Sequence, residues 1–291
     1  MASDEGAHVA TAEAAIRAGR PKAALAALTA AVKAEPARSD LRVFLAQLLC
    51  VLGEWERAHT QLNVAADLDE LARPMREMVG HALRCEKMRA AVFEGRRSPM
   101  VFGEPDAWLA CLIESNLRAG AGEIELARSL GRQAFEAAPT NPGKIDGAAF
   151  EWIADADSRL GPVLEAMVNG RYYWVPFTHL AEVRIEPPAD LRDIVWLPAQ
   201  LRFLNGGEVI AMLPMRYPGS ERSDDEQVVM ARKTEWRPDG AGADADQRWF
   251  GLGQRVLTTD QGDHDLLGVR SIQFAAEQKS AATEHPAAGH G

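Results

Sequence analysis

Cysteine is scarce in this sequence, and long apolar stretches are missing. Only three cysteines occur among the 291 residues, Cys50, Cys85 and Cys111. Because their number is odd and they lie far apart, they argue against a disulfide framework and against a zinc site. The most apolar helix-like run, Leu41 to Leu52, is too short to cross a bilayer. We therefore expect reduced thiols, no metal and no membrane segment.

Positive charge is also in short supply. The chain has 42 acidic and 32 basic residues, for a formal net charge of −10. An acidic surface repels phosphate groups, so neither nucleic acid nor an anionic membrane is expected as a general partner. The first residues, MASDEGAHVATAEAAIRAG, lack the basic start and apolar segment of a signal peptide. These features predict a cytoplasmic protein.

Catalytic and cofactor motifs are missing as well. Gly251-Leu252-Gly253 is only a fragment of a dinucleotide fingerprint, and the sequence contains no P-loop. No serine lies in a nucleophile elbow, and no cysteine has a histidine at a recognisable catalytic spacing. We therefore expect no cofactor and no catalytic residue, and a protein that is not an enzyme.

What the sequence does contain is an internal repeat in its first half. Gly19 and Gly53 begin equivalent segments about 34 residues apart, the period of tetratricopeptide helix pairs. A small-large-small pattern follows each glycine at the same offsets, as Ala24, Leu28, Ala31 and as Ala58, Leu62, Ala65. A third, poorer unit runs from Trp108 to Pro139, with a turn that carries about two extra residues. A long helix near Leu71–Glu94 separates it from the second unit.

The composition changes after Thr140-Asn141-Pro142-Gly143. About five or six short strands and one or two helices are predicted beyond it. The clearest element is a hairpin that turns at Asn205-Gly206-Gly207. The sequence predicts a multi-domain α+β fold, with tetratricopeptide-like repeats in residues 1–143 and a small barrel-like or curled β-rich domain in residues 144–276. A disordered tail is expected over residues 277–291.

The segment EWIADADSRLGPVLE gathers carboxylates beside an arginine. Asp155, Asp157 and Arg159 could serve acid–base chemistry or hold a metal, which would make the protein a hydrolase. In the alternative that we favour, the segment is a structural motif that begins with Trp152. Asp157 then caps a helix over about residues 158–168, and Asp155 pairs with Arg159.

Aromatic residues cluster at Trp152, Tyr172, Tyr173, Trp174 and Phe177. The cluster is either the core of the β-rich half or a recognition platform. Because adjacent strand residues face opposite ways, either Tyr172 or Tyr173 is the best candidate for contact with a partner.

The first helix of the second repeat, Asp40 to Leu52, is the candidate binding element. Tetratricopeptide units present a concave groove in which an amphipathic helix can dock. Its predicted lining on this helix is Val43, Phe44, Gln47, Cys50 and Val51. Phe44 would supply apolar contact and Gln47 would fix orientation; packing of Phe44 against a neighbouring helix is an equal alternative.

Several long runs resemble the ImpE/SciE (TagJ) accessory proteins of bacterial type VI secretion systems. The most specific are PGKIDGAAFEWIADADSRLGPVLEAMVNGRYYWVPF and GLGQRVLTTDQGDHDLLGVRSIQF. The resemblance covers nearly the whole chain and is densest from Val101 to Phe274. It implies a cytoplasmic, non-enzymatic protein that binds the N-terminal helix of the small contractile-sheath subunit. It also implies a link to sheath assembly, or to sheath recycling by an AAA+ ATPase. A generic scaffold for another pair of proteins is the alternative.

Overall fold

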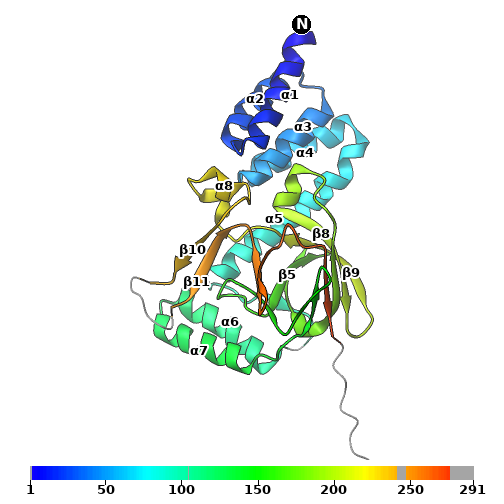
Figure 1. Cartoon of the computed structure of the whole chain (residues 1–291). Coiled ribbons are helices and arrows are strands. Elements are labelled where there is room, and N and C mark those ends of the chain that lie inside the picture. The colour runs from blue at the N-terminus through cyan, green and yellow to red at the C-terminus, as the bar shows by residue number, and fades with distance from the viewer. Residues whose placement is uncertain (1, 104, 241–246, 276–291) are drawn as a thin grey trace, which may run out of the picture.

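The first part of the chain is mostly helical, and the second part forms curled sheets (Figure 1). This computed structural model describes residues 2–103, 105–240 and 247–275. The helices of the first part are α1 (Ala2–Arg17), α2 (Pro21–Ala34), α3 (Ser39–Val51), α4 (Trp55–Leu68), α5 (Arg73–Phe93), α6 (Ala107–Gly120) and α7 (Ile124–Ala137). The predicted α+β fold is confirmed, while the predicted tail lies outside the described residues.

Glycine turns join the helices of each repeat. Gly53 adopts φ +71° between α3 and α4, a conformation that side chains with a Cβ rarely take. Its N–H donates to the carbonyl of Cys50 at 3.2 Å, and the next N–H donates to the carbonyl of Leu49 at 2.9 Å. These bonds satisfy carbonyls that the end of α3 would leave unpaired. Gly19, with φ +69°, has the equivalent place between α1 and α2.

The turn of the third unit is as short as the others, so the prediction of about two extra residues is wrong. Gly122, at φ +83°, lies one residue beyond the cap of α6, as Gly53 does for α3. Counted from Gly122, the small-large-small positions hold Ala127, Gly131 and Ala134. The central glycine lets α7 approach α6 closely, with the Oγ of Ser115 3.3 Å from where a Cβ would stand.

The strands form one large sheet and two small ones, and all of them except β1 come from the second part of the chain. Their bounds are β1 (Met100–Val101), β2 (Gly143–Ile145), β3 (Ala148–Phe150), β4 (Ile153–Asp155), β5 (Val163–Val168), β6 (Arg171–Pro176), β7 (Leu180–Ile185), β8 (Trp196–Phe203), β9 (Glu208–Pro214), β10 (Thr234–Pro238), β11 (Trp249–Gly253), β12 (Val256–Thr259), β13 (Gly262–Asp265) and β14 (Ser271–Phe274). The nine-stranded sheet has the order β1-β6-β5-β9-β8-β7-β14-β2-β3 and is open at both ends. The hairpin β8–β9 confirms the predicted turn at residues 205–207, but the strands are more numerous than predicted.

The helix predicted over residues 158–168 is wrong. Residues 157–160 form a turn, and Val163–Val168 form β5, which pairs with β6 and with β9. All six residues of β5 are buried, because both faces of the sheet are covered at this strand. Val163 and Met167 pack against the helices, while Leu164 and Ala166 point into the curled sheet.

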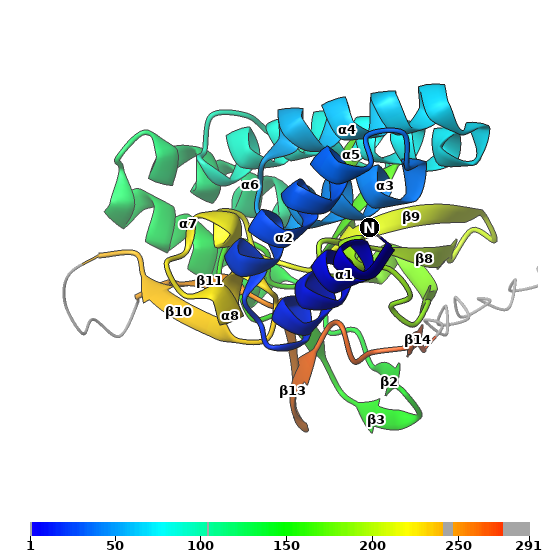
Figure 2. The same ribbon diagram turned by 90° about the horizontal axis from the view of Figure 1, so that it is seen from above.

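Helices α3 to α7 lie along one side of the sheets in the view from above (Figure 2), while α1 and α2 lie beyond the sheets at the top of Figure 1. One hydrophobic cluster combines residues of the helices with Trp174 and Trp196 on the helix-facing side of the sheet. A second cluster fills the interior of the curled sheet. The first cluster contains residues from both sides of position 143 in the sequence. The division into two domains at that position therefore stays a prediction.

Candidate functional site

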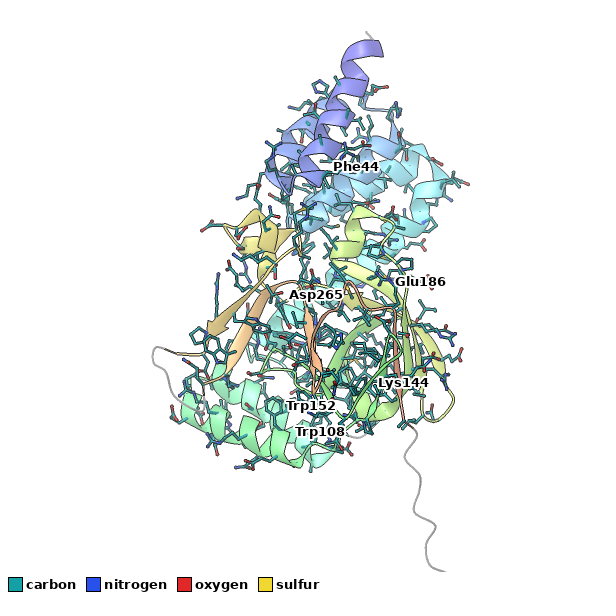
Figure 3. All side chains as sticks on the ribbon, in the orientation of Figure 1. Phe44, Trp108, Lys144, Trp152, Glu186 and Asp265 are labelled. Atoms are coloured by element: carbon teal, nitrogen blue, oxygen red, sulfur yellow. The ribbon has the colours of Figure 1, made fainter. Side chains whose placement is uncertain are left out.

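A groove in the helical part brings together three of the predicted binding residues. It has a volume of about 490 Å³ and lies between α3, the start of α5 and residues 189–191. Val43, Phe44 and Gln47 line it, as the sequence suggested, although their part in binding stays a prediction. Figure 3 shows Phe44 among the helices, far from Trp152 in the β-rich part. The two therefore belong to different surfaces.

Cys50 does not reach the groove, which corrects its assignment as a binding residue. Its side chain is 0% exposed. Burial raises the pKa of its thiol to about 12, against the opposing charges of Arg216 and Arg192. Val51 is equally buried, and its carbonyl accepts a hydrogen bond from Arg216 of the back half at 2.8 Å. The 3-10 helix η3 (Leu191–Ile194) also contacts α3. On α3, the groove therefore reaches from Ser39 to Gln47 and stops before the last turn.

Two side chains of the groove differ sharply in exposure. Leu71, in the 3-10 helix η1 (Glu70–Ala72), is 87% exposed, which is the highest value among the large apolar residues in the described ranges. Gln47 is only 8% exposed, and its amide makes no hydrogen bond to any residue that the structure describes. An apolar residue in water gains from a bound ligand, and an amide that opens into the groove needs a hydrogen-bonding group there once a ligand displaces the solvent. Sequence periodicity predicted Gln47 but missed Leu71, which lies outside the regular repeat.

The aromatic cluster is mostly core. Tyr172 is 2% exposed, so its assignment to partner binding is corrected. Its hydroxyl donates to Oε1 of Glu165 at 2.6 Å and accepts from Nε1 of Trp174 at 2.7 Å. Tyr173 faces the other way and is half-buried; its ring stacks on Phe102 at a centroid distance of 4.3 Å.

Asp157 fixes a turn and caps no helix. Its Oδ1 accepts from the backbone N–H of Arg159 at 2.9 Å, and its Oδ2 accepts from Gly251 N–H at 2.8 Å. Both oxygens also pair with the Arg159 guanidinium, at 2.8 and 2.5 Å. That guanidinium lies between the rings of Phe93 and Phe250, at 4.6 and 4.5 Å from their centroids. The motif therefore holds the turn against α5 and β11.

Asp155 pairs with Arg255, which corrects the predicted pairing with Arg159. The Asp155 Oδ2 accepts from Nε and Nη2 of Arg255 at 3.0 and 2.5 Å, and its Oδ1 accepts from the Tyr217 hydroxyl at 3.0 Å. Burial raises the pKa of Asp155 to about 6, against the attraction of Arg255. No sequence pattern predicts this pair, whose members lie 100 residues apart.

Arg255 also joins Asp155 to a second buried carboxylate. Its Nη1 lies 2.9 Å from Oε2 of Glu165, and Glu165 in turn pairs with Arg89 of α5. Burial opposes ionisation of Glu165, but Arg89 and Arg255 hold its pKa below the ordinary 4.5. This network connects the helices to the sheets through charges that are satisfied inside the protein.

Trp152 lies on the rim of a separate cavity of about 320 Å³. Its side chain is 39% exposed, and that of the neighbouring Phe135 is 40% exposed. Phe135 packs on Gly161, where any Cβ would collide with the ring. Trp152 is therefore a surface residue. It lies next to the buried motif of Asp155 and Asp157, of which it was predicted to be the beginning.

Neither a metal cluster nor a membrane helix is found in the described ranges. Within residues 2–103, 105–240 and 247–275, no three His, Cys, Asp or Glu side chains are placed to share a metal ion. In the same residues, no helix combines the length and apolarity needed to cross a bilayer.

Comparison with known proteins matches both parts of the chain. The sequence model of the ImpE protein family matches residues 147–273, and that of a tetratricopeptide repeat matches residues 15–73. The type VI secretion system accessory component TagJ of Pseudomonas aeruginosa is 44% identical over 263 residues, which are 90% of this chain and 90% of that protein.

A solved structure has the same fold. The crystal structure of protein VPA1032 from Vibrio parahaemolyticus superposes with a TM-score of 0.81, over 92% of this chain and 98% of that one. At 24% sequence identity, that likeness concerns the fold alone. The ImpE match, together with 44% identity to TagJ over nine-tenths of both chains, shows that the chain belongs to the ImpE family.

Proposed function

We propose that this chain is a cytoplasmic, non-enzymatic accessory protein of a type VI secretion system. In this role it binds the N-terminal helix of the small contractile-sheath subunit in the groove of α3 and α5. Through that contact it acts on sheath assembly or on recycling of the sheath by an AAA+ ATPase. The accessory role of TagJ, the 44% identical relative, supports the secretion system as the setting.

The groove is the observation that carries the proposal. Its apolar lining by Val43, Phe44 and Leu71 offers the surface that the apolar stripe of a helix requires. The back half of the chain forms one wall through residues 189–191 and leaves the rest accessible. The carboxylates considered for catalysis, Asp155 and Asp157, are held by arginines and backbone donors, which favours a structural role for them.

Titration of the purified protein with a peptide of the sheath subunit's first helix tests the proposal. Leu71→Asp places a charge in the groove at a side chain that is 87% exposed, so folding should be preserved. It should raise the Kd at least about tenfold, the equivalent of about 1.4 kcal/mol. Gln47→Ala should weaken binding in the same direction.

Leu204→Asp is the matched control. Leu204 is also an exposed leucine, at 50%, but it lies beside the turn of the β8–β9 hairpin, away from the groove. It should bind the peptide as the wild type does. Equal weakening by the two leucine variants, or no binding by the wild type, would refute docking in this groove.

A further inference from the structure

The charged residues that line the groove are all acidic. Asp40, Asp69 and Asp190 line it, and no lysine, arginine or histidine is among the residues that line it. The side chains of Asp40 and Asp190 are 64% and 43% exposed. A cationic group above the rim can therefore approach them from solvent.

The three carboxylates are fixed in position before any ligand arrives. Asp40 pairs with Arg38 at 2.6 Å, and Asp69 accepts a hydrogen bond from Leu71 N–H at 2.9 Å. Asp190 closes the capping box at the start of η3 and lies 3.4 Å from Arg192. Acceptors that are already ordered lose little entropy when a cation joins them.

Gln47 supplies a second, independent observation at the floor of the same groove. The residue is 8% exposed, its amide has no hydrogen-bond partner among the described residues, and neither amide atom is fully enclosed, so solvent in the groove reaches the amide. A polar ligand group can replace that solvent as the hydrogen-bond partner of the amide. A purely apolar helix face would displace the solvent and leave the amide buried without a partner, which costs free energy.

We propose that the groove selects a basic amphipathic helix with one hydrogen-bonding side chain within its apolar stripe. Lysine or arginine residues along the edges of the stripe meet the rim carboxylates, and the polar side chain meets Gln47. This inference rests on the proposed function for the site, and it adds the chemistry by which one helix is chosen over another.

Three synthetic helices of about five turns, or about 18 residues, test the selection. The first has lysines along the edges of the stripe and one serine within it. The second replaces those lysines with glutamates, and the third keeps the lysines but replaces the serine with alanine. The first should bind the full chain most tightly, and its advantage over the second should shrink as salt is added.

Variants of the protein locate the selection. Asp69→Asn with Asp190→Asn removes two rim charges but keeps an oxygen acceptor at each cap. This double variant should bind the lysine–serine peptide about fivefold more weakly, which is the effect expected from the loss of two exposed ion pairs. Asp263→Asn with Asp265→Asn makes the same change of charge at exposed residues of β13 and should leave affinity unchanged. Gln47→Met should abolish the preference for serine over alanine.

Each outcome decides one of the two claims. Equal affinity for lysine and glutamate peptides, or equal effects of the two aspartate pairs, would overturn the charge selection. An unchanged serine preference in Gln47→Met would overturn the role of the amide. If these selections fail while the sheath peptide still binds and Leu71→Asp weakens it, the proposed function stands. Failure of the sheath peptide itself counts against the proposed function.

Discussion

Arg89 of α5 and Glu165 of β5 form a two-pronged ion pair at the junction of the helices and the sheet. The Arg89 Nε donates to Oε1 at 2.6 Å, and its Nη2 donates to Oε2 at 2.9 Å. Both side chains are almost fully buried, at 4% and 0% exposure. The helical repeats are therefore attached to the β-rich part by charge as well as by apolar packing.

Replacement of Arg89 should strongly lower the free energy of unfolding. Arg89→Met leaves Glu165 buried with fewer donors, and removal of one member of a buried pair costs about 3–5 kcal/mol. Lys87→Met, two residues away on the same helix, affects an exposed pair with Glu56 and should change stability little. Urea unfolding of the two variants measures the contrast. A similar loss in both would show that the position on α5 matters and the buried pair does not.

Stability should fall at acid pH, in part through Glu165. Its pKa in the folded protein lies below 4.5, because Arg89 and Arg255 outweigh the effect of burial. The stabilisation is therefore complete above the unfolded pKa and is lost as the pH falls through the folded pKa. Unfolding free energies between about pH 6 and about pH 3 should decline less in Glu165→Gln than in the wild type. Parallel curves would contradict this origin.

The glycine turns should differ in their tolerance of alanine. Gly122→Ala forces a Cβ into positive φ with no atom nearby and should cost about 1 kcal/mol. Gly53→Ala adds a clash with Glu221, whose Cβ would stand 2.8 Å from the new atom, so it should cost more. Thermal unfolding of the two variants gives the comparison. Equal costs would mean that Glu221 moves aside without loss.

The thiols should react in a fixed order. Burial raises the pKa of Cys50 to about 12 and that of Cys85 to about 11, and both side chains are buried. Cys111 is partly exposed, and burial raises its pKa as well. A thiol reagent at about pH 8 should label Cys111 first and the other two only on unfolding, as mass spectrometry can show. Rapid labelling of Cys50 in the native protein would place it in the groove after all.

The sequence predicted most reliably what local chemistry determines. The glycine turns and small-residue positions of the repeats follow from backbone geometry, and Asn205-Gly206-Gly207 similarly determines the β8–β9 hairpin. The residues of β5, by contrast, include Leu164, Glu165, Ala166 and Met167, all good helix formers. Pairing with β6 and β9 overrides that preference, and neither partner strand can be inferred from residues 163–168 alone.

In the candidate site, too, the sequence predicted what depends on local periodicity and missed what depends on contacts between distant segments. Helix periodicity placed Val43, Phe44 and Gln47 on the groove because they lie on one face of α3. It also placed Cys50 there, since it could not show that Arg216 and its neighbours in the back half contact the end of that helix. The pairing of Asp155 with Arg255 depends on a contact between segments 100 residues apart.

Site-specific photocrosslinking tests the central claim most directly. A photoreactive amino acid at position 71 lies in the groove, and one at position 210 lies on β9, where Ile210 is 67% exposed. With the small sheath subunit bound, position 71 should crosslink to the subunit's N-terminal helix and position 210 should not. A complex that forms without a crosslink from position 71, or that crosslinks from position 210, would contradict binding in the groove.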